Sequence, residues 1–178
     1  SAYARLYDEE GCIDDFSGAN WLTISEDSYI RCGYEIKPHN YKIGYYPYPF
    51  MSTVEDTGKG LAIVVSDQAT NGEVAAAMNL MADLSTATGK ENEIQFGLLS
   101  DLQSMGANRT IIVSNYNNLP AEYKSLVRET DQLDTAGVVT FTDDKAGNPL
   151  LLVVSNDDDC LTEAAYMLMD EDRADQEK

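Results

Sequence analysis

The sequence has few of the residues on which metal sites and nucleophilic catalysis depend. Its 178 residues include one histidine, His39, and three cysteines, Cys12, Cys32 and Cys160, none of them at C-x-x-C spacing. These residues match no zinc motif. No G-x-S-x-G elbow is present either, and the many acids single out no carboxylate pair for hydrolysis. We therefore predict no catalytic residue, no metal site and no enzymatic activity.

Basic residues and long apolar runs are also scarce. Lys and Arg number 12 against 31 Asp and Glu, which gives a formal net charge of -19. Such a surface repels phosphate backbones and argues against a nucleic-acid partner. The apolar runs, such as residues 150–154, are far too short to cross a bilayer. The chain begins at Ser1 without a basic and apolar leader, so we expect any leader or membrane anchor of a longer parent protein to lie outside it.

The composition changes near residue 50. Residues 1–44 are rich in Tyr, Asp and Gly and hold short alternating runs at 21–24 and 28–32, which predict the C-terminal strands of a β-rich module. Residues 45–59 form a connector that begins with Tyr and Pro. Because each proline favours extended geometry in the residue before it, we expect this connector to be stiff and to run along the next domain. Phe50 should be buried there, and Tyr45 should lie nearer the outside.

Residues 60–170 alternate between strand and helix patterns, and residues 171–178 form a charged tail. Strands are expected at 61–65, 94–99, 110–114, 137–141 and 150–154, and helices at 73–88, 120–129 and from about 157 to 169. The first helix should bury Val74, Ala77, Met78, Met81 and Leu84. Residues 143–149 are dense in turn formers and too short for a crossover, so the last two strands should form an antiparallel hairpin. The pattern predicts a flavodoxin-like three-layer α/β/α sandwich with a mostly parallel sheet.

Three loops follow strands that should be parallel, where ligands of such sheets bind. Residues 66–72 match neither a P-loop nor G-x-G-x-x-G and contain no lysine, so helix capping is favoured and no flavin or other cofactor is predicted. In residues 114–118, Asn115 and Tyr116 could contact sugar hydroxyls, although Asn is also typical of turns. Residues 155–159 are acidic but lack calcium-loop spacing, which favours a helix cap there too.

Aromatic side chains offer a second set of carbohydrate-binding candidates. Trp21, Tyr45, Tyr46 and Tyr48 could stack on a pyranose, or they could serve core packing and docking of the connector. Cys12 and Cys32 lie in one N-terminal segment and could form a disulfide in an oxidising compartment, or remain two buried thiols.

Several short motifs, taken in order, resemble the B subunit of bacterial cellulose synthase. They are residues 11–15 (GCIDD), 20–24 (NWLTI), 27–30 (DSYI), 46–50 (YPYPF), 152–156 (LVVSN) and 161–165 (LTEAA). Asn156 stands where we would expect a glycine in that family. The resemblance covers most of the chain and implies the end of a carbohydrate-binding-like module followed by a flavodoxin-like domain.

The resemblance also implies a function. It points to an extracytoplasmic, membrane-tethered accessory protein that stabilises the membrane-embedded catalytic subunit of cellulose synthase and guides the emerging β-glucan chain. The family is also named for cyclic-di-GMP binding, but this sequence has no Arg-rich site for that dinucleotide, and FMN is not expected. Two other classes stay open: a stand-alone carbohydrate-binding or adhesion module, and a flavin- or nucleotide-dependent enzyme.

Overall fold

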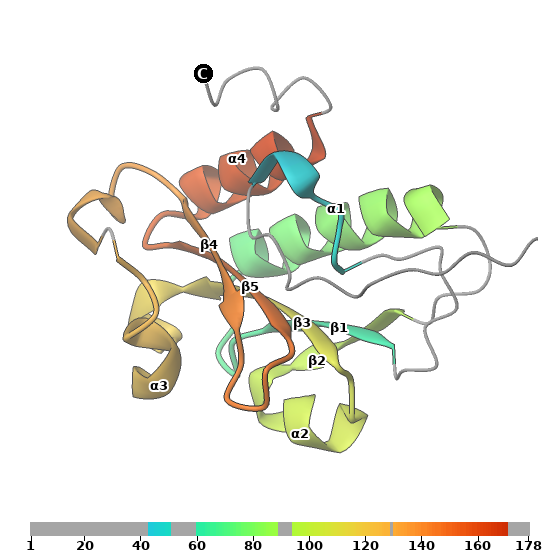
Figure 1. Cartoon of the computed structure of the whole chain (residues 1–178). Helices are drawn as coiled ribbons and strands as arrows, with labels where there is room; N and C mark the ends of the chain where they lie inside the picture. Colours follow the sequence, from blue (N-terminus) through green and yellow to red (C-terminus); the bar gives the residue numbers. More distant parts are fainter. Residues whose placement is uncertain (1–42, 51–59, 89–93, 129, 171–178) are drawn as a thin grey trace, which may run out of the picture. The chain divides into compact units, whose positions relative to one another are not determined.

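The computed structural model describes residues 43–50, 60–88, 94–128 and 130–170 (Figure 1). The chain divides into two compact units, Ser1–Lys37 and Pro38–Lys178, and the described residues belong to the second. Trp21, Cys12, Cys32, the expected N-terminal strands and the charged tail lie outside the described residues.

Five strands form one sheet in the order β2-β1-β3-β5-β4. They are β1 (Leu61–Val65), β2 (Ile94–Leu98), β3 (Arg109–Asn115), β4 (Val138–Asp143) and β5 (Pro149–Ser155). All neighbouring pairs are parallel except β4 and β5, which form an antiparallel hairpin. The three central strands are almost wholly buried, as expected from the apolar runs at 61–65, 111–113 and 150–154. A mixed α/β fold with a mostly parallel sheet and one hairpin is confirmed.

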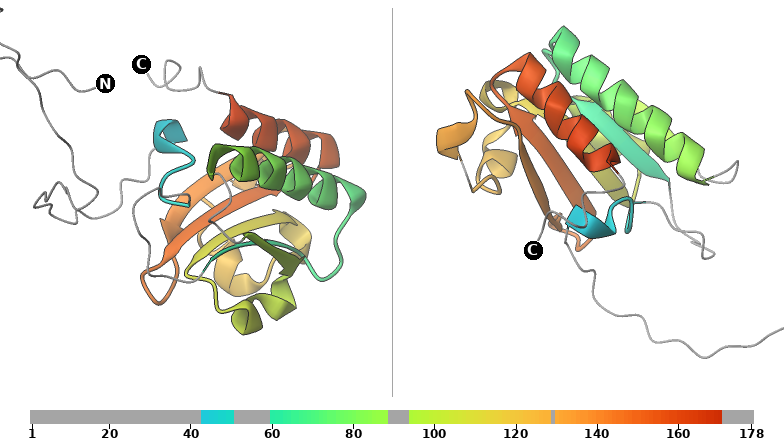
Figure 2. Two further views of the ribbon diagram at one scale, coloured as in Figure 1. Left: turned by 90° about the vertical axis from the view of Figure 1, so that its right-hand side faces the viewer. Right: turned by 90° about the horizontal axis from the view of Figure 1, so that it is seen from above.

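Alternate residues of the central strands face two separate hydrophobic cores. Ile63, Ile111 and Leu151 belong to the core beneath α1 (Asn71–Thr88) and α4 (Asp158–Met169). Val64, Ile112 and Leu152 belong to the core on the other side, where the short helices α2 (Leu102–Met105) and α3 (Ala121–Lys124) lie. Figures 1 and 2 show α1 and α4 side by side on one face of the sheet. These four helices on two faces are compatible with a three-layer sandwich.

The buried face of α1 differs from the predicted one. Val74 and Met78, expected in the core, are 36% and 47% exposed, so this prediction is wrong. The buried residues are Glu73, Ala76, Ala77, Leu80 and Leu84. Their spacing follows one helical face that includes a carboxylate, which hydrophobic periodicity cannot place inside. The helix also begins at Asn71, two residues earlier than expected.

On the opposite face of the sheet, the helix α3 is shorter than predicted and the helix α2 was not predicted. The helix expected at 120–129 is wrong in length, since α3 ends at Lys124. The chain then tightens through bonds from Leu126 N–H to Tyr123 O (3.0 Å) and from Val127 N–H to Lys124 O (3.2 Å). Between β2 and β3, where no helix was expected, α2 follows a 3₁₀ turn at Leu99–Asp101. It ends at Gly106, whose φ of 61° is a left-handed conformation that favours glycine.

Residues 43–50 fold back in turns and are not extended, which corrects the expectation of an extended connector. After the 3₁₀ turn at Ile43–Tyr45, Tyr48 N–H donates to Tyr45 O (2.8 Å) and Phe50 N–H donates to Pro47 O (2.9 Å). The peptide bonds before both prolines are cis. This path brings Tyr46 and Phe50 into the α1/α4 core. Phe50 is fully buried and Tyr45 is 52% exposed, as expected.

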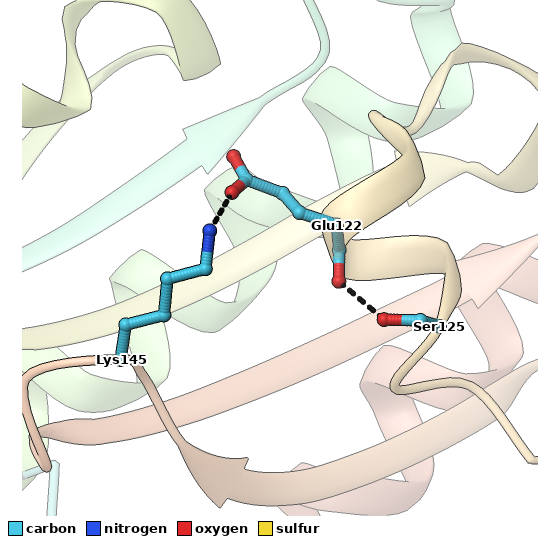
Figure 3. A network of polar contacts seen from close by, with 3 residues as sticks. All are labelled: Glu122, Ser125 and Lys145. Atoms are coloured by element: carbon cyan, nitrogen blue, oxygen red, sulfur yellow. Dashed lines mark hydrogen bonds and ion pairs between the residues drawn. The ribbon is translucent and has the colours of Figure 1, made fainter.

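The loop of the β4–β5 hairpin is organised by Asp144. Its carboxylate accepts hydrogen bonds from Ala146 N–H (2.8 Å), Asn148 N–H (2.8 Å) and the Asn148 side-chain amide (3.0 Å). Partial burial alone would raise the pKa of Asp144, but these bonds outweigh it and the pKa lies below its usual value. Next to it, Lys145 forms an exposed ion pair with Glu122 of α3 at 2.5 Å (Figure 3).

Candidate functional site at the carboxyl edge of the sheet

The strand order reverses at β1, because β2 lies on one side of it and β3 on the other. Open α/β sheets bind ligands beyond the carboxyl ends of the strands at such a point. Since β1, β3 and β5 are parallel, the loops that follow them meet at the same edge. A binding site is therefore expected first in the loops that follow these strands, at residues 66–70, 116–120 and 156–157.

The carboxylate of Glu73 joins the ends of β1 and β3. Glu73 is fully buried, and it accepts hydrogen bonds from the Ser66 hydroxyl (2.8 Å), from Thr70 N–H (3.1 Å) and from Asn115 N–H. These three donors come from the end of β1, the helix cap and the end of β3. They satisfy the buried charge from three directions, as a buried carboxylate requires.

Thr70 and Glu73 also form a capping box at the start of α1. The Thr70 hydroxyl oxygen accepts a bond from Glu73 N–H at 3.2 Å, while the Glu73 carboxylate accepts the bond from Thr70 N–H. The sequence carries the signal for this arrangement, T-x-x-E at 70–73. Sequence reasoning favoured capping in this loop but missed Glu73.

A second carboxylate, Asp158 of α4, ties the starts of the two long helices together. It accepts bonds from the Thr70 hydroxyl (2.6 Å) and from Gly72 N–H (3.2 Å). A Cβ on Gly72 would lie 2.4 Å from the Cβ and Cγ of Asp158, so the approach of α4 depends on glycine at this position. Donors around the start of α1 that an anionic ligand would need are thus taken by two side chains of the protein.

The asparagines at the end of β3 and just after it form hydrogen bonds with neighbouring loops. The side-chain oxygen of Asn115 accepts a bond from Asn117 N–H (2.9 Å), and its amide donates to Asn156 O (3.1 Å). Asn117 donates to the Asn156 side chain at 3.1 Å, and Asn156 donates to Asp134 at 2.7 Å. The polar atoms of Asn115 that could meet sugar hydroxyls are therefore already engaged.

The other sugar candidates lie in different environments. Tyr116 is half-buried and packs against the α2/α3 core with Lys124 Nζ 5.2 Å from its ring centroid. Tyr46 is 4% exposed, so its ring faces serve the core and are closed to a stacked ligand. Tyr45 and Tyr48 are 52% and 45% exposed. About half of the surface of each of these two residues is thus exposed.

The candidates among the described residues do not form one cluster. Phe50, at the end of the Tyr–Pro segment, stacks on Phe141 with ring centroids 5.8 Å apart. Phe141 pairs with Leu151 near the beginning of β5, whereas Asn115 pairs with Ser155 at the end of that strand. The segment that carries the tyrosines is therefore packed near the opposite end of β5 from Asn115.

The acidic loop after β5 caps α4, as the sequence predicted. Asp157 accepts bonds from Asp159 N–H and Cys160 N–H, each at 3.0 Å. The hydrogen bond from the Cys160 backbone lowers the pKa of Asp157 below its usual value, against a smaller effect of burial. In the part of the chain that the structure describes, no group of three or more His, Cys, Asp or Glu side chains could hold a metal ion.

No protein-family model matches the sequence, and comparison with curated proteins finds no match. Among the described helices, none combines the length and the apolar character needed to span a membrane.

Proposed function

We propose that this chain belongs to a non-catalytic, extracytoplasmic accessory protein of a bacterial polysaccharide synthase, like the B subunit of cellulose synthase. In this proposal Pro38–Lys178 holds a flavodoxin-like domain that has no cofactor role. It acts as a rigid body within the complex. The observation that carries the non-catalytic part of this proposal is the buried carboxylate of Glu73 at the switch point of the sheet.

The buried carboxylate of Glu73 argues against the binding of a flavin or nucleotide at this edge of the sheet. Phosphate groups bind at helix starts through backbone N–H and hydroxyl donors. Here the donors of Ser66, Thr70 and Asn115 hold a carboxylate, so a phosphate would have to displace it and lie beside a second one, Asp158. A phosphate and the carboxylate of Asp158 carry charges of the same sign and would repel each other at such close range. An interaction role therefore fits the carboxyl edge better than cofactor chemistry.

The synthase assignment rests on the order of the sequence motifs at 11–15, 20–24, 46–50 and 152–156. The strand reversal at β1 and the helices on both faces of the sheet agree with a flavodoxin-like domain. We propose the membrane-embedded glycosyltransferase as the partner and the β-glucan chain as a transient ligand.

The test is association with a synthase. The gene next to this one should encode a processive glycosyltransferase with transmembrane helices, and the two proteins should copurify from detergent-solubilised membranes. Polymer synthesis from a nucleotide sugar in those membranes should fall when this protein is deleted and return when it is restored. An unrelated neighbour, or polymer synthesis that is indifferent to the deletion, would contradict the proposal.

A stand-alone carbohydrate-binding module is the second candidate, favoured by the two exposed rings of Tyr45 and Tyr48. Exposed aromatic faces can stack on the apolar face of a pyranose. This candidate predicts saturable binding of soluble cello-oligosaccharides without any synthase, and loss of that binding in a Tyr45→Ala/Tyr48→Ala variant.

A further inference from the structure

A pocket of about 400 Å³ lies at the carboxyl edge of the sheet, on the face opposite α1 and α4. Three parts of the chain line it, namely the loop after β1 (Asp67), the turn and short helix after β2 (Leu99, Ser100, Leu102 and Gln103), and the crossing from β3 (Pro120, Glu122 and Tyr123). Because β2 and β3 lie on the two sides of β1 and run parallel to it, this pocket lies where open α/β sheets bind ligands.

The apolar part of the lining is anchored on the core. Leu99, Leu102 and Tyr123 are partly buried and pack against the hydrophobic core on this face of the sheet. Since these side chains are already held by the core, a ligand that buries apolar surface against them does not have to order them first. The pocket therefore favours a ligand with an apolar body.

The two charged residues in this lining are both acidic. Asp67 accepts a hydrogen bond from Ser100 N–H at 3.0 Å, which joins the loop after β1 to the turn after β2. The same bond lowers the pKa of the Asp67 carboxyl below its usual value, so the group is ionised at neutral pH. Glu122 supplies the second carboxylate, and Lys145 Nζ lies 2.5 Å from it (Figure 3). The structure thus already shows an ammonium group bound to one of the two carboxylates.

This lining fits an organic cation better than a metal ion. Two carboxylates alone do not make a calcium site, which takes more oxygen ligands, and among the described residues no group of three or more His, Cys, Asp or Glu side chains could hold a metal. An organic cation can also use the rest of the pocket, because its apolar body can contact the leucines and its charge can lie over the ring of Tyr123. The net charge of -19 attracts cations to the protein and repels anions.

We propose that this pocket binds a small organic cation, a primary ammonium group on an apolar body, whose charge is bound by the carboxylates of Asp67 and Glu122. Leu99, Leu102 and Tyr123 hold the apolar body. The ligand competes with Lys145 for Glu122, because both present an ammonium group to the same carboxylate. This proposal goes beyond the proposed synthase role and does not depend on it.

The probes are phenethylamine, 2-phenylethanol and phenylacetate, which share a phenyl ring and differ in charge. Each is titrated into the full chain at low salt, and binding is followed through the backbone amide signals in two-dimensional nuclear magnetic resonance spectra. We expect phenethylamine to give saturable shifts centred on Ser100 and Gln103, since the N–H of Ser100 is bonded to Asp67. The neutral alcohol should bind about tenfold more weakly, because it lacks the charge-assisted bonds, and phenylacetate should not bind.

Three variants isolate the roles of the charged groups. Asp67→Asn keeps an oxygen acceptor for Ser100 N–H but loses the charge, and it should weaken phenethylamine binding about tenfold. Glu163→Gln, the same loss of charge at an exposed residue of α4, is the matched control and should leave the affinity unchanged. Lys145→Ala should strengthen binding, because it removes the competing ammonium group from Glu122. Melting curves check that all three variants are folded.

The proposal is overturned if phenethylamine does not bind saturably, if the alcohol binds as well as the amine, if Asp67→Asn and Glu163→Gln act equally, or if Lys145→Ala weakens the binding. A capped peptide with one lysine between glycines is the fourth probe. If this peptide shifts the same amide signals and phenethylamine does not, the pocket binds a lysine side chain of a partner protein, which would also overturn the proposal of a small ligand.

Discussion

Glu73, in the first turn of α1, accepts a hydrogen bond from the backbone N–H of Asn115 at the end of β3, 42 positions along the chain. The same carboxylate holds the Ser66 hydroxyl after β1. One side chain therefore joins the helix to the two strands between which the sheet reverses its order. A buried charge with all its donors in place is costly to disturb, because removing it leaves those donors without a partner.

The first prediction concerns the stability of this junction. Glu73→Ala should lower the free energy of unfolding by about 3 kcal/mol, since buried donors lose a charged acceptor. Glu73→Gln keeps the shape and one oxygen acceptor and should cost less. Urea unfolding followed by circular dichroism measures both. Glu122→Ala, which removes a half-exposed carboxylate, is the matched control, and a loss for Glu73→Ala no larger than for this control would contradict the role assigned to Glu73.

The second prediction concerns the Tyr–Pro segment. Phe50 is fully buried and stacks on Phe141 of β4, so Phe50→Ala should cost about 3 to 5 kcal/mol of unfolding free energy. Tyr45→Ala, which removes a 52% exposed ring, should cost far less. If the Phe50→Ala variant melts at the temperature of the parent, the segment is not part of the folded unit.

The sheet was predictable because its strands are short, apolar and separated by turn formers. Residues 61–65 and 150–154 can be read as buried strands from their side chains alone, and the turn-rich residues 143–149 exclude a crossover. The short helix α2 escaped prediction because a single turn has no periodicity to detect. Its one signal is Gly106, which is consistent with a helix end but does not require one.

The site was harder to predict than the fold because it depends on a buried carboxylate, that of Glu73. Periodicity assigns apolar residues to the buried face of α1, which favoured Val74 and Met78 over a face through Glu73. The T-x-x-E capping box at 70–73 was the available clue. The partners Asn115 and Asp158 come from distant parts of the chain, and only the packing of the strands and helices brings them to this end of α1.

The third prediction follows from the lowered pKa of Asp144 in the hairpin loop. Because the folded pKa lies below the unfolded value of about 4, the ionised side chain stabilises the loop above that pH, and the benefit disappears as the pH falls through the folded pKa. Asp144→Asn should therefore be less stable than the parent at pH 7, with a difference that shrinks at pH 3. Urea titrations at the two pH values provide the comparison, and a difference independent of pH would refute this role.

The fourth prediction tests the compartment. In an oxidising environment Cys12 and Cys32 should pair, with a loop-closure stabilisation of about 3 kcal/mol in the chain-entropy model. Cys160 is a free thiol in the structure. Thiol titration of denatured, non-reduced protein from its native source should then count one thiol, whereas three would remove both the disulfide and its support for an extracytoplasmic location.

The central claim is that the switch point of this sheet is closed by Glu73 and has no cofactor role. Thermal unfolding of the native protein with and without FMN, and in phosphate against chloride at equal ionic strength, tests it most directly. A bound ligand at one hundred times its dissociation constant would add about 2.7 kcal/mol to the free energy of unfolding, which is easily detected. The account predicts a colourless protein whose melting temperature is the same with FMN as without it, and unchanged between the two salts. A clear rise with FMN, or a rise specific to phosphate that does not depend on ionic strength, would contradict it.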